Sequence, residues 1–319
     1  MKILVAMPVE KEHKNLLESV HPDGEFTYLM GEKPKEDQLC DAEVIIGNVS
    51  PKMLKYCKSL RLLQLNMAGS DAYAKKMPIG ALLANASGAY GLAISEHMIG
   101  MLLMLMKKLY LYRDNQNKSL WRDEGSVTSI EGSVALTVGL GDIGGEFARR
   151  CKALGAYCIG IRRNTTNAPE YMDEMYTLEA LDSLLPKADI VALALPNSSE
   201  SRRLMDENRL RKMKPGAILL NVGRGSAIDT DALVRVLNDG HIRAGLDVTD
   251  PEPLPADHPL WQCPGVLITP HISGYYHLRQ THDRIIKIAA HNLENLINGR
   301  PIKNLVDDET GYRMPENRY

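Results

Sequence analysis

Short apolar runs alternate with amphipathic, charged stretches along most of the chain. In the N-terminal part, helix-like spacing of apolar positions at Glu10–Val20 and Pro51–Leu60 separates runs typical of buried strands. The strands predicted there are Ile3–Met7, Ala42–Asn48, Leu62–Asn66 and Ala81–Ala86. The pattern then restarts, and the later predicted strands are Val134–Leu140, Ala156–Ile161, Ile190–Leu195, Ala217–Gly223, Ile242–Val248 and Val266–Pro270.

Continuous apolar strands separated by helices are typical of parallel sheets that helices cover on both faces. The pattern therefore predicts an α/β protein with two doubly wound parallel-sheet units, one over residues 1–93 and one beginning at residue 94. The stretch from Leu278 begins with helical spacing. It ends in a polar run, Asp307–Tyr319, that we expect to be poorly ordered.

Composition and charge exclude several classes of protein. The 319 residues carry 38 Lys+Arg against 40 Asp+Glu, a formal net charge of -2, which argues against a nucleic-acid or membrane partner recognised by bulk charge. Five cysteines without a C-x-x-C pair are typical of a reduced, cytoplasmic chain. No signal peptide is visible, and the apolar run Met98–Met106 is far shorter than the ~20 residues that span a bilayer. We expect that run to be a buried helix at a subunit or domain contact.

A glycine-rich turn follows the first strand of the second unit. The turn is Gly139-Leu-Gly141-Asp142-Ile143-Gly144, with an apolar strand before it and a helix-like segment after it. In a dinucleotide site the first glycine makes the turn, the second lets the backbone approach a pyrophosphate, and the third permits close helix–strand packing. The helix N-terminus then presents free N–H groups to the phosphates. The alternative is a strand–helix turn without a ligand.

The next strand indicates which dinucleotide is bound. An NAD site usually carries an acidic residue about 20 residues after the turn, where it binds the ribose 2′-hydroxyl. Here the strand is followed by Arg162-Arg163-Asn164-Thr165, without a carboxylate. Two guanidinium groups suit the 2′-phosphate of NADP(H), so we favour NADP(H), with NAD(H) possible. The alternative is that these arginines are a solvated loop.

Three segments after later strands carry a candidate catalytic set: Asn221–Asp229 with Arg224, Gly245–Pro255 with Glu252, and Thr269–Gly274 with His271. Reduction of a 2-oxo acid needs a fixed cation for the carboxylate and carbonyl, and a proton donor that titrates near neutrality. It also needs a carboxylate that orients the donor. Taken singly, His271 could be structural, Arg224 a turn residue and Glu252 part of a rigid loop. The remaining histidines form no metal-binding motif, so no metal is predicted.

These motifs resemble those of the D-isomer-specific 2-hydroxyacid dehydrogenase family. The matching blocks are Gly139–Gly144, Leu195–Asn197, Asn221–Asp229, Gly245–Pro255, Thr269–Gly274 and, near the N-terminus, Asn66–Asp71. The resemblance implies a Rossmann coenzyme domain, residues 94–277, inserted into a flavodoxin-like substrate domain, residues 1–93 and 278–319. It also implies a homodimer built around the helix near Ser95–Tyr112.

The resemblance further assigns roles by position. His271 would be the proton donor and acceptor, Glu252 its partner, and Arg224 the anchor of the substrate carboxylate and carbonyl. The backbone amides of Ala68 and Gly69 would bind the substrate carboxylate. Asp247 would meet the nicotinamide carboxamide, and the other residues implied at the cofactor site are Pro196, Val222 and Gly274.

Two departures and two alternatives bear on these implications. Many relatives carry an aspartate where Arg162 stands, and two tyrosines, Tyr275 and Tyr276, replace the small residues common after Gly274. Glyoxylate, hydroxypyruvate or a larger apolar 2-oxo acid are the expected substrates. The family also includes dinucleotide-binding corepressors, so a regulator without physiological turnover is the alternative function. A formate dehydrogenase is disfavoured because Glu252 stands where that branch has glutamine.

Overall fold

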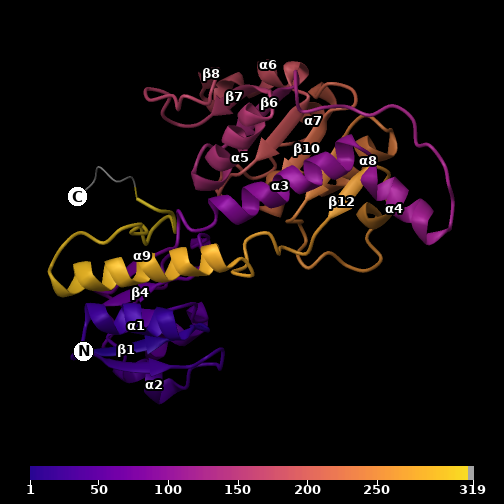
Figure 1. Cartoon of the computed structure of the whole chain (residues 1–319). Helices are drawn as coiled ribbons and strands as arrows, with labels where there is room; N and C mark the ends of the chain where they lie inside the picture. Colours follow the sequence, from indigo (N-terminus) through magenta and orange to yellow (C-terminus); the bar gives the residue numbers. More distant parts are fainter. Residues whose placement is uncertain (315–319) are drawn as a thin grey trace. The chain divides into compact units, whose positions relative to one another are not determined.

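The structure is a computed structural model, and it describes residues 1–314. The chain divides into two compact units: unit 1 comprises Met1–Tyr90 and the segment from Tyr276 on, and unit 2 is Gly91–Tyr275. Each unit is a parallel sheet flanked by helices, as Figure 1 shows. The predicted α/β class with two doubly wound parallel sheets is confirmed. No helix among the described residues is long and apolar enough to cross a membrane.

Unit 1 holds five parallel strands in the order β2-β1-β3-β4-β5. The bounds are β1 Lys2–Val5, β2 Glu25–Tyr28, β3 Val44–Ile46, β4 Leu62–Gln64 and β5 Leu82–Ala84. Helices α1 Lys11–Val20, α2 Glu36–Asp41 and α9 Arg279–Ile297 accompany them, with 3₁₀ turns at Pro51–Tyr56 and Asp71–Tyr73. Leu4, Ile45 and Leu63 are buried side chains that lie side by side on β1, β3 and β4 and belong to one core.

The C-terminal segment returns to this unit. Helix α9 packs along α1, and Asn292 of α9 donates a buried hydrogen bond of 2.6 Å to Oε1 of Gln64 on β4. Beyond α9, Leu305 forms a bridge to Ala84, and Val306 to Arg313. The prediction of a poorly ordered polar end is therefore wrong for residues 307–314, which are hydrogen-bonded to the unit. Residues 315–319 lie outside the described residues.

Unit 2 holds seven parallel strands in the order β12-β11-β10-β9-β6-β7-β8. The strands are β6 Val134–Val138, β7 Tyr157–Ile161, β8 Glu174–Tyr176, β9 Ile190–Leu193, β10 Ile218–Asn221, β11 Arg243–Leu246 and β12 Val266–Ile268. The helices are α3 Gly91–Met106, α4 Leu109–Asn117, α5 Asp142–Ala153, α6 Leu181–Leu184, α7 Glu207–Lys212 and α8 Thr230–Asn238. Aspartates cap two of them: the Asp206 side chain accepts from Arg209 N, and that of Asp229 from Ala232 N.

The sheet of unit 2 is covered on both faces because successive side chains of a strand point to opposite sides. On β11, Ala244 and Leu246 belong to the core cluster that contains buried residues of α6, α7 and α8. Gly245 between them faces α3, where a Cβ would come within 3.1 Å of the Met101 side chain. Helix α3 also packs along α5. Helix α3 therefore lies against β10 and β11, the strands that precede the Arg224 and Glu252 segments.

Each of the predicted strands is confirmed, but two edge strands, β2 and β8, were not predicted. Predicted helix Pro51–Leu60 is a shorter 3₁₀ turn. The helix predicted near Ser95–Tyr112 is broken at Lys108, whose φ of 55° is left-handed, so α3 and α4 are separate helices.

Candidate active site

The carboxyl ends of the unit 2 strands lie along one edge of the sheet because all the strands run parallel. Six segments that follow strands lie in order along that edge. Residues 269–274 follow β12, residues 247–252 follow β11, and residues 222–225 follow β10. Residues 195–197, 139–144 and 162–166 come next, after β9, β6 and β7. The chain changes direction between β9 and β6, and open α/β sheets bind ligands at such a switch point. The topology therefore brings the predicted motifs of unit 2 to one edge.

The glycine turn has the geometry that a dinucleotide site requires. Gly139 has a φ of 97°, and a Cβ there would lie 2.6 Å from Ala194 O. A Cβ on Gly144 would lie 1.9 Å from Gly139 O, so only glycine allows α5 to pack this closely on the turn. Beside Gly141, in contrast, a Cβ would meet nothing within 4 Å. The open space at Gly141 and the N-terminus of α5 together fit a pyrophosphate.

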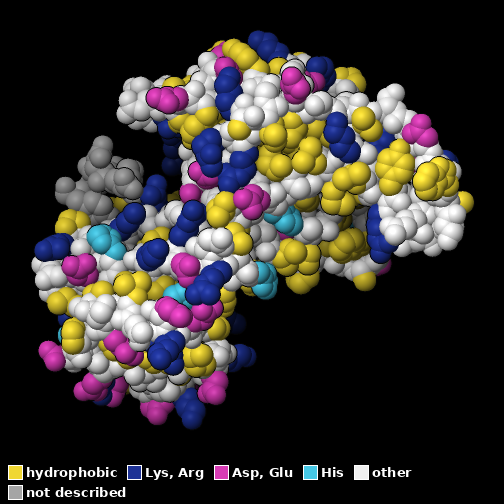
Figure 2. Space-filling model, in the orientation of Figure 1, with side chains coloured by type: hydrophobic (Ala, Val, Ile, Leu, Met, Phe, Trp, Pro, Cys, Tyr) yellow, Lys and Arg dark blue, Asp and Glu magenta, His cyan; other side chains and the backbone are white. Residues whose placement is uncertain are grey.

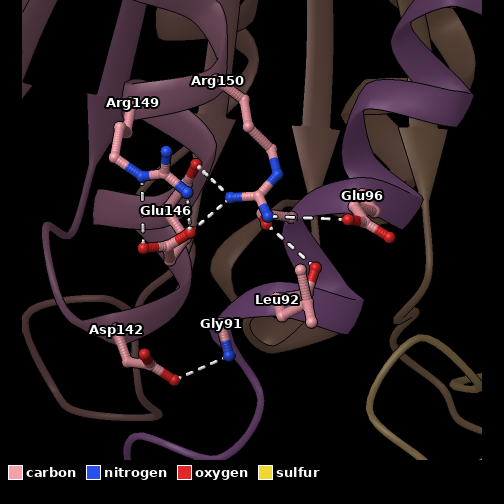
Figure 3. A network of polar contacts seen from close by, with 8 residues as sticks. Gly91, Leu92, Glu96, Asp142, Glu146, Arg149 and Arg150 are labelled. Atoms are coloured by element: carbon pink, nitrogen blue, oxygen red, sulfur yellow. Dashed lines mark hydrogen bonds and ion pairs between the residues drawn. The ribbon is translucent and has the colours of Figure 1, made fainter. Parts of the chain in front are cut away.

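The first residue of α5 also holds the start of α3. Asp142 accepts a hydrogen bond of 2.7 Å from the backbone N–H of Gly91 (Figure 3). Farther along the two helices, Arg150 lies 3.6 Å from Glu96 and is also paired with Glu146. These contacts tie α3 to the helix that begins at the glycine turn. The predicted cofactor role of the neighbouring Ile143 stays a prediction.

The loop after β7 presents the predicted 2′-phosphate ligands. Arg162 donates to Asn167 O within the same loop, and its buried Nε has no hydrogen-bond partner. Arg163 is mostly exposed and lies 3.3 Å from Oε2 of Glu200, on the loop after β9. Asn164 accepts from Thr166 N at 2.9 Å. The loop thus carries two guanidinium groups, one of which has a carboxylate as its counter-ion.

His271 and Glu252, on the loops after β12 and β11, form a hydrogen-bonded pair. His271 Nδ1 lies 2.6 Å from Oε1 of Glu252, and the two side chains are 48% and 41% exposed. A carboxylate at Nδ1 fixes the neutral ring with its proton on that nitrogen, which leaves Nε2 to exchange a proton with a ligand. The pair therefore has the arrangement of an oriented general acid and base.

Arg224 follows β10 in a loop that packs against the Glu252 loop. A Cβ on Gly225 would lie 2.0 Å from the backbone of Thr249, so glycine is required for the two loops to meet. Asn221 braces the turn, since its amide donates to Arg224 O at 2.9 Å and its side-chain oxygen accepts from Gly223 N at 3.1 Å. The topology places Arg224 on the loop between those of Glu252 and Pro196.

Asp247 is 1% exposed, and its carboxylate binds the segment around His271. Oδ1 accepts from the Thr269 hydroxyl at 2.6 Å and from Ile272 N at 3.0 Å. Oδ2 accepts from Ser273 N at 3.1 Å and from the Ser273 hydroxyl. Sequence reasoning did not identify this set of partners, although Thr269 and Ser273 lie in the predicted His271 block. The predicted contact of Asp247 with the nicotinamide carboxamide stays a prediction.

The remaining predicted site residues lie on loops that follow strands of the two units. Val222 is buried at the end of β10, Pro196 is exposed after β9, and Gly274 follows Ser273. Ala68 and Gly69 belong to unit 1, in the loop after β4, where Asn85 donates to Ala68 O at 2.8 Å. Their predicted roles in ligand binding stay predictions. Within residues 1–314 there is no group of three or more His, Cys, Asp or Glu side chains placed to share a metal ion.

Residues 99–273, which include every strand of the unit 2 sheet, match the family model described as D-isomer specific 2-hydroxyacid dehydrogenase, NAD binding domain. The chain belongs to this family. A D-isomer specific 2-hydroxyacid dehydrogenase family protein from Aeromonas salmonicida is 31% identical, with a TM-score of 0.85 over 96% of this chain and 99% of that one. The predicted resemblance and the predicted class, an NAD(P)-dependent D-2-hydroxyacid dehydrogenase, are confirmed.

Two further relatives of the dehydrogenase bear on its ligands. A structure of D-isomer specific 2-hydroxyacid dehydrogenase from Xanthobacter autotrophicus, in complex with NADPH and MES, is 26% identical, with a TM-score of 0.80 over 98% of this chain and 99% of that one. Among curated proteins, glyoxylate reductase from Thermofilum pendens is 29% identical over 289 residues, 87% of this chain and 83% of that protein.

Proposed function

We propose that this dehydrogenase reduces a 2-oxo acid to the D-2-hydroxy acid, with His271 as general acid and base. The observation that carries the proposal is the 2.6 Å contact between His271 Nδ1 and Glu252 Oε1. It joins the imidazole to a carboxylate that accepts a hydrogen bond from Nδ1, so that Nε2 is left for the substrate. A bound nicotinamide dinucleotide supplies the hydride. His271 donates a proton from Nε2 to the substrate oxygen, and in the reverse reaction it accepts that proton.

In the same proposal, Arg224 binds the carboxylate of the 2-oxo acid and polarises its carbonyl. A guanidinium suits this role because it is charged throughout the working pH range and donates in a fixed fork. The loop of Arg224 is braced by Asn221 and by the close approach at Gly225. The backbone amides of Ala68 and Gly69 supply further donors for the carboxylate.

For the cofactor we propose NADP(H), bound at the glycine turn with its 2′-phosphate near Arg162, Arg163 and Asn164. Support comes from the two guanidinium groups on this loop and from the absence of a carboxylate in residues 162–167. A 26% identical relative was solved in complex with NADPH. Glu200 forms an ion pair with Arg163, and its negative charge would repel a 2′-phosphate there. The Glu200 side chain is mostly exposed, so it can rotate away when the phosphate binds.

For the substrate we propose glyoxylate, hydroxypyruvate or a larger apolar 2-oxo acid. A small anionic substrate needs little beyond Arg224, and a 29% identical relative is named glyoxylate reductase. Of the aromatic residues that could shape an apolar pocket, Tyr275 is 53% exposed, whereas Tyr90 is 4% exposed and donates its hydroxyl to Asn66 O. Tyr275 is therefore the better candidate for contact with a side chain of the substrate.

We also propose that the protein acts as a homodimer and works in the cytoplasm. Large hydrophobic side chains are exposed on α3, α4 and the loop that follows, and Figure 2 shows such side chains gathered over this part of unit 2. They are Met104, Leu109, Tyr112, Leu120, Trp121 and Val127. An exposed apolar surface of this kind is typical of a protein–protein interface.

The proposed function is tested by comparing NADPH and NADH oxidation in the presence of glyoxylate, hydroxypyruvate, pyruvate, 2-oxoisocaproate and phenylpyruvate. We expect turnover with NADPH and at least one of these acids, and a D configuration of the product. We expect His271→Ala and Arg224→Ala to lose most of that turnover. Tight NADPH binding with no turnover on any 2-oxo acid would instead support the regulatory alternative.

A further inference from the structure

His97 lies on α3, outside the glycine turn and the catalytic pair. Its Nε2 lies 3.0 Å from Oγ1 of Thr269 and 3.9 Å from Oδ1 of Asp247. The Thr269 hydroxyl donates its single proton to Asp247 over 2.6 Å. A hydroxyl whose proton is engaged can only accept from a third group, so Nε2 of His97 carries a proton and donates it to Thr269. The three side chains form one directed chain of hydrogen bonds.

That chain ends on the carboxylate that holds the His271 segment. Asp247 binds Thr269 on one side of His271 and Ile272 and Ser273 on the other. The backbone N–H of His271 donates to Asp247 O at 2.8 Å. His271 has a φ of 53°, a left-handed conformation that costs a non-glycine residue about 1–2 kcal/mol. The surrounding hydrogen bonds therefore hold a backbone that would otherwise relax.

The anchor at the other end is a rigid element. Helix α3 is fixed by Asp142 at Gly91, by Arg150 at Glu96 and by its packing on β11 and α5. The His271 and Glu252 side chains, in contrast, are each about half exposed and lie on loops. A contact from the helix to the loop limits the positions that the imidazole can take.

We propose that His97 is a positioning residue for His271, acting through Thr269 and Asp247. The proposal deepens the proposed function, because it rests on His271 being the proton donor. His97 does not touch the substrate; it keeps the His271 ring where Nδ1 meets Glu252. A misplacement of about 1 Å in such a site can cost on the order of 100-fold in rate.

The direct test is the tautomer of neutral His271, read from ¹⁵N chemical shifts of the imidazole above its titration range. The signal is assigned by its loss in His271→Gln. We expect the wild type to hold the Nδ1–H form, as the contact with Glu252 requires. In His97→Leu and in Thr269→Val, we expect the balance to move toward the Nε2–H form preferred by free imidazole. His97→Gln and Thr269→Ser, which keep the donor and the hydroxyl, should resemble the wild type.

Steady-state kinetics supply the second readout. We expect kcat of His97→Leu to fall roughly 10- to 100-fold, with KM for the 2-oxo acid and the affinity for NADPH changed by less than about threefold. Gly100→Ala is the matched control, because it changes an exposed residue of α3 where an added Cβ meets nothing within 4 Å. The control should leave both the tautomer and kcat unchanged.

The proposal is overturned if His97→Leu keeps His271 in the Nδ1–H form, whatever happens to kcat, or if Gly100→Ala produces the same change. The tautomer measurement needs no turnover. If the wild type reduces no 2-oxo acid, the proposed function fails, and the tautomer balance still decides whether His97 positions the ring.

Discussion

The hydrogen bond between His271 and Glu252 joins two loops that follow neighbouring parallel strands, β12 and β11. Both residues were found in the sequence because each stands in a short block, of recognisable composition, that follows an apolar run. Their mutual contact follows from topology, since the carboxyl ends of adjacent parallel strands lie side by side. The sequence alone was therefore enough to predict His271 and Glu252 as partners.

The contribution of Glu252 can be tested by removing its charge while keeping its shape. In Glu252→Gln the neutral amide binds Nδ1 of His271 less strongly than the carboxylate does, so we expect the ring to be held less firmly and kcat for reduction to fall about 10-fold. Steady-state kinetics with the 2-oxo acid measure this. A variant with the kcat of the wild type would remove Glu252 from the proposed role.

The cofactor preference can be tested at the loop after β7. Arg162→Asp places a carboxylate where NAD-specific sites carry one, so we expect the ratio of kcat/KM for NADPH to that for NADH to fall at least about 10-fold. Glu200→Gln, which releases Arg163 from its ion pair, should raise the same ratio. An unchanged ratio in Arg162→Asp would contradict the proposed NADP(H) preference.

The contacts that support the His271 segment gave no signal in the sequence. His97 lies 172 positions before Thr269 and stands in a helix whose apolar run indicates packing and nothing else. Asp247 was singled out, but its buried set of donors depends on the backbone path of residues 269–273. Such contacts arise from tertiary structure, which periodicity and spacing do not encode.

At the scale of elements, the interior strands were predictable because they are buried on both faces and form continuous apolar runs. Strands β2 and β8 lie at sheet edges, where none of their residues is buried, and their sequences EFTY and EMY are mostly polar or aromatic. The break at Lys108 was missed for a different reason. A left-handed backbone position is recognised in a sequence mainly when it holds glycine or asparagine, so a lysine at such a position gives no sign that the helix is interrupted.

Two glycines of the turn before α5 differ in the space available for a side chain. In Gly144→Ala the new Cβ would collide with Gly139 O, so we expect a loss of stability of about 1–3 kcal/mol and of NADPH binding. In Gly141→Ala the Cβ meets no protein atom, so stability should be kept while NADPH binding weakens. Unfolding by denaturant and a titration with NADPH separate the two effects. Equal destabilisation by both changes would contradict this account.

Helices α1 and α9 contain a buried histidine pair that makes the stability of unit 1 dependent on pH. The rings of His13 and His282 lie 4.4 Å apart, and His282 Nε2 is 2.9 Å from Pro8 O. Burial, followed by the neighbouring His13, lowers the pKa of His282 below its usual 6.5. The unfolded chain then binds the proton more readily than the folded chain. The contribution of the neutral ring is complete above pH 6.5 and is lost as the pH falls below that value.

We therefore expect the thermal unfolding temperature of the wild type to decrease as the pH is lowered from 7.5 to 5.5. The unfolding temperature of His282→Gln should decrease less. Circular dichroism at a series of pH values measures both. The hydrogen bond with His13 lowers the pKa of Asp283, whose contribution is lost only in the more acid range below 3.8, so the two effects do not overlap. Parallel declines in the two proteins would exclude His282 as the cause.

At the scale of the whole molecule, the proposed homodimer depends on the exposed side chains of α3, α4 and the following loop, which would form its interface. Trp121 is completely exposed, so Trp121→Ser removes apolar surface without disturbing packing within the chain. We expect the wild type to sediment at twice the mass of the chain and Trp121→Ser to dissociate at lower concentration. Ile79→Ser, which removes an equally exposed side chain from unit 1, is the control. A wild-type protein that sediments as a monomer at micromolar concentration would contradict the dimer.

The pairing of Gln64 with Asn292 has a consequence for biosynthesis. The amide of Gln64 is buried in the finished protein, yet its partner is encoded 228 residues later. At a synthesis rate of ~5–20 residues per second, roughly 10–45 s pass before α9 emerges from the ribosome. During that interval the sheet of unit 1 lacks the helix that pairs with Gln64, while unit 2 emerges as one uninterrupted segment. All of unit 2 is therefore synthesised before the last segment of unit 1, and the N-terminal strands wait longest for their final contacts.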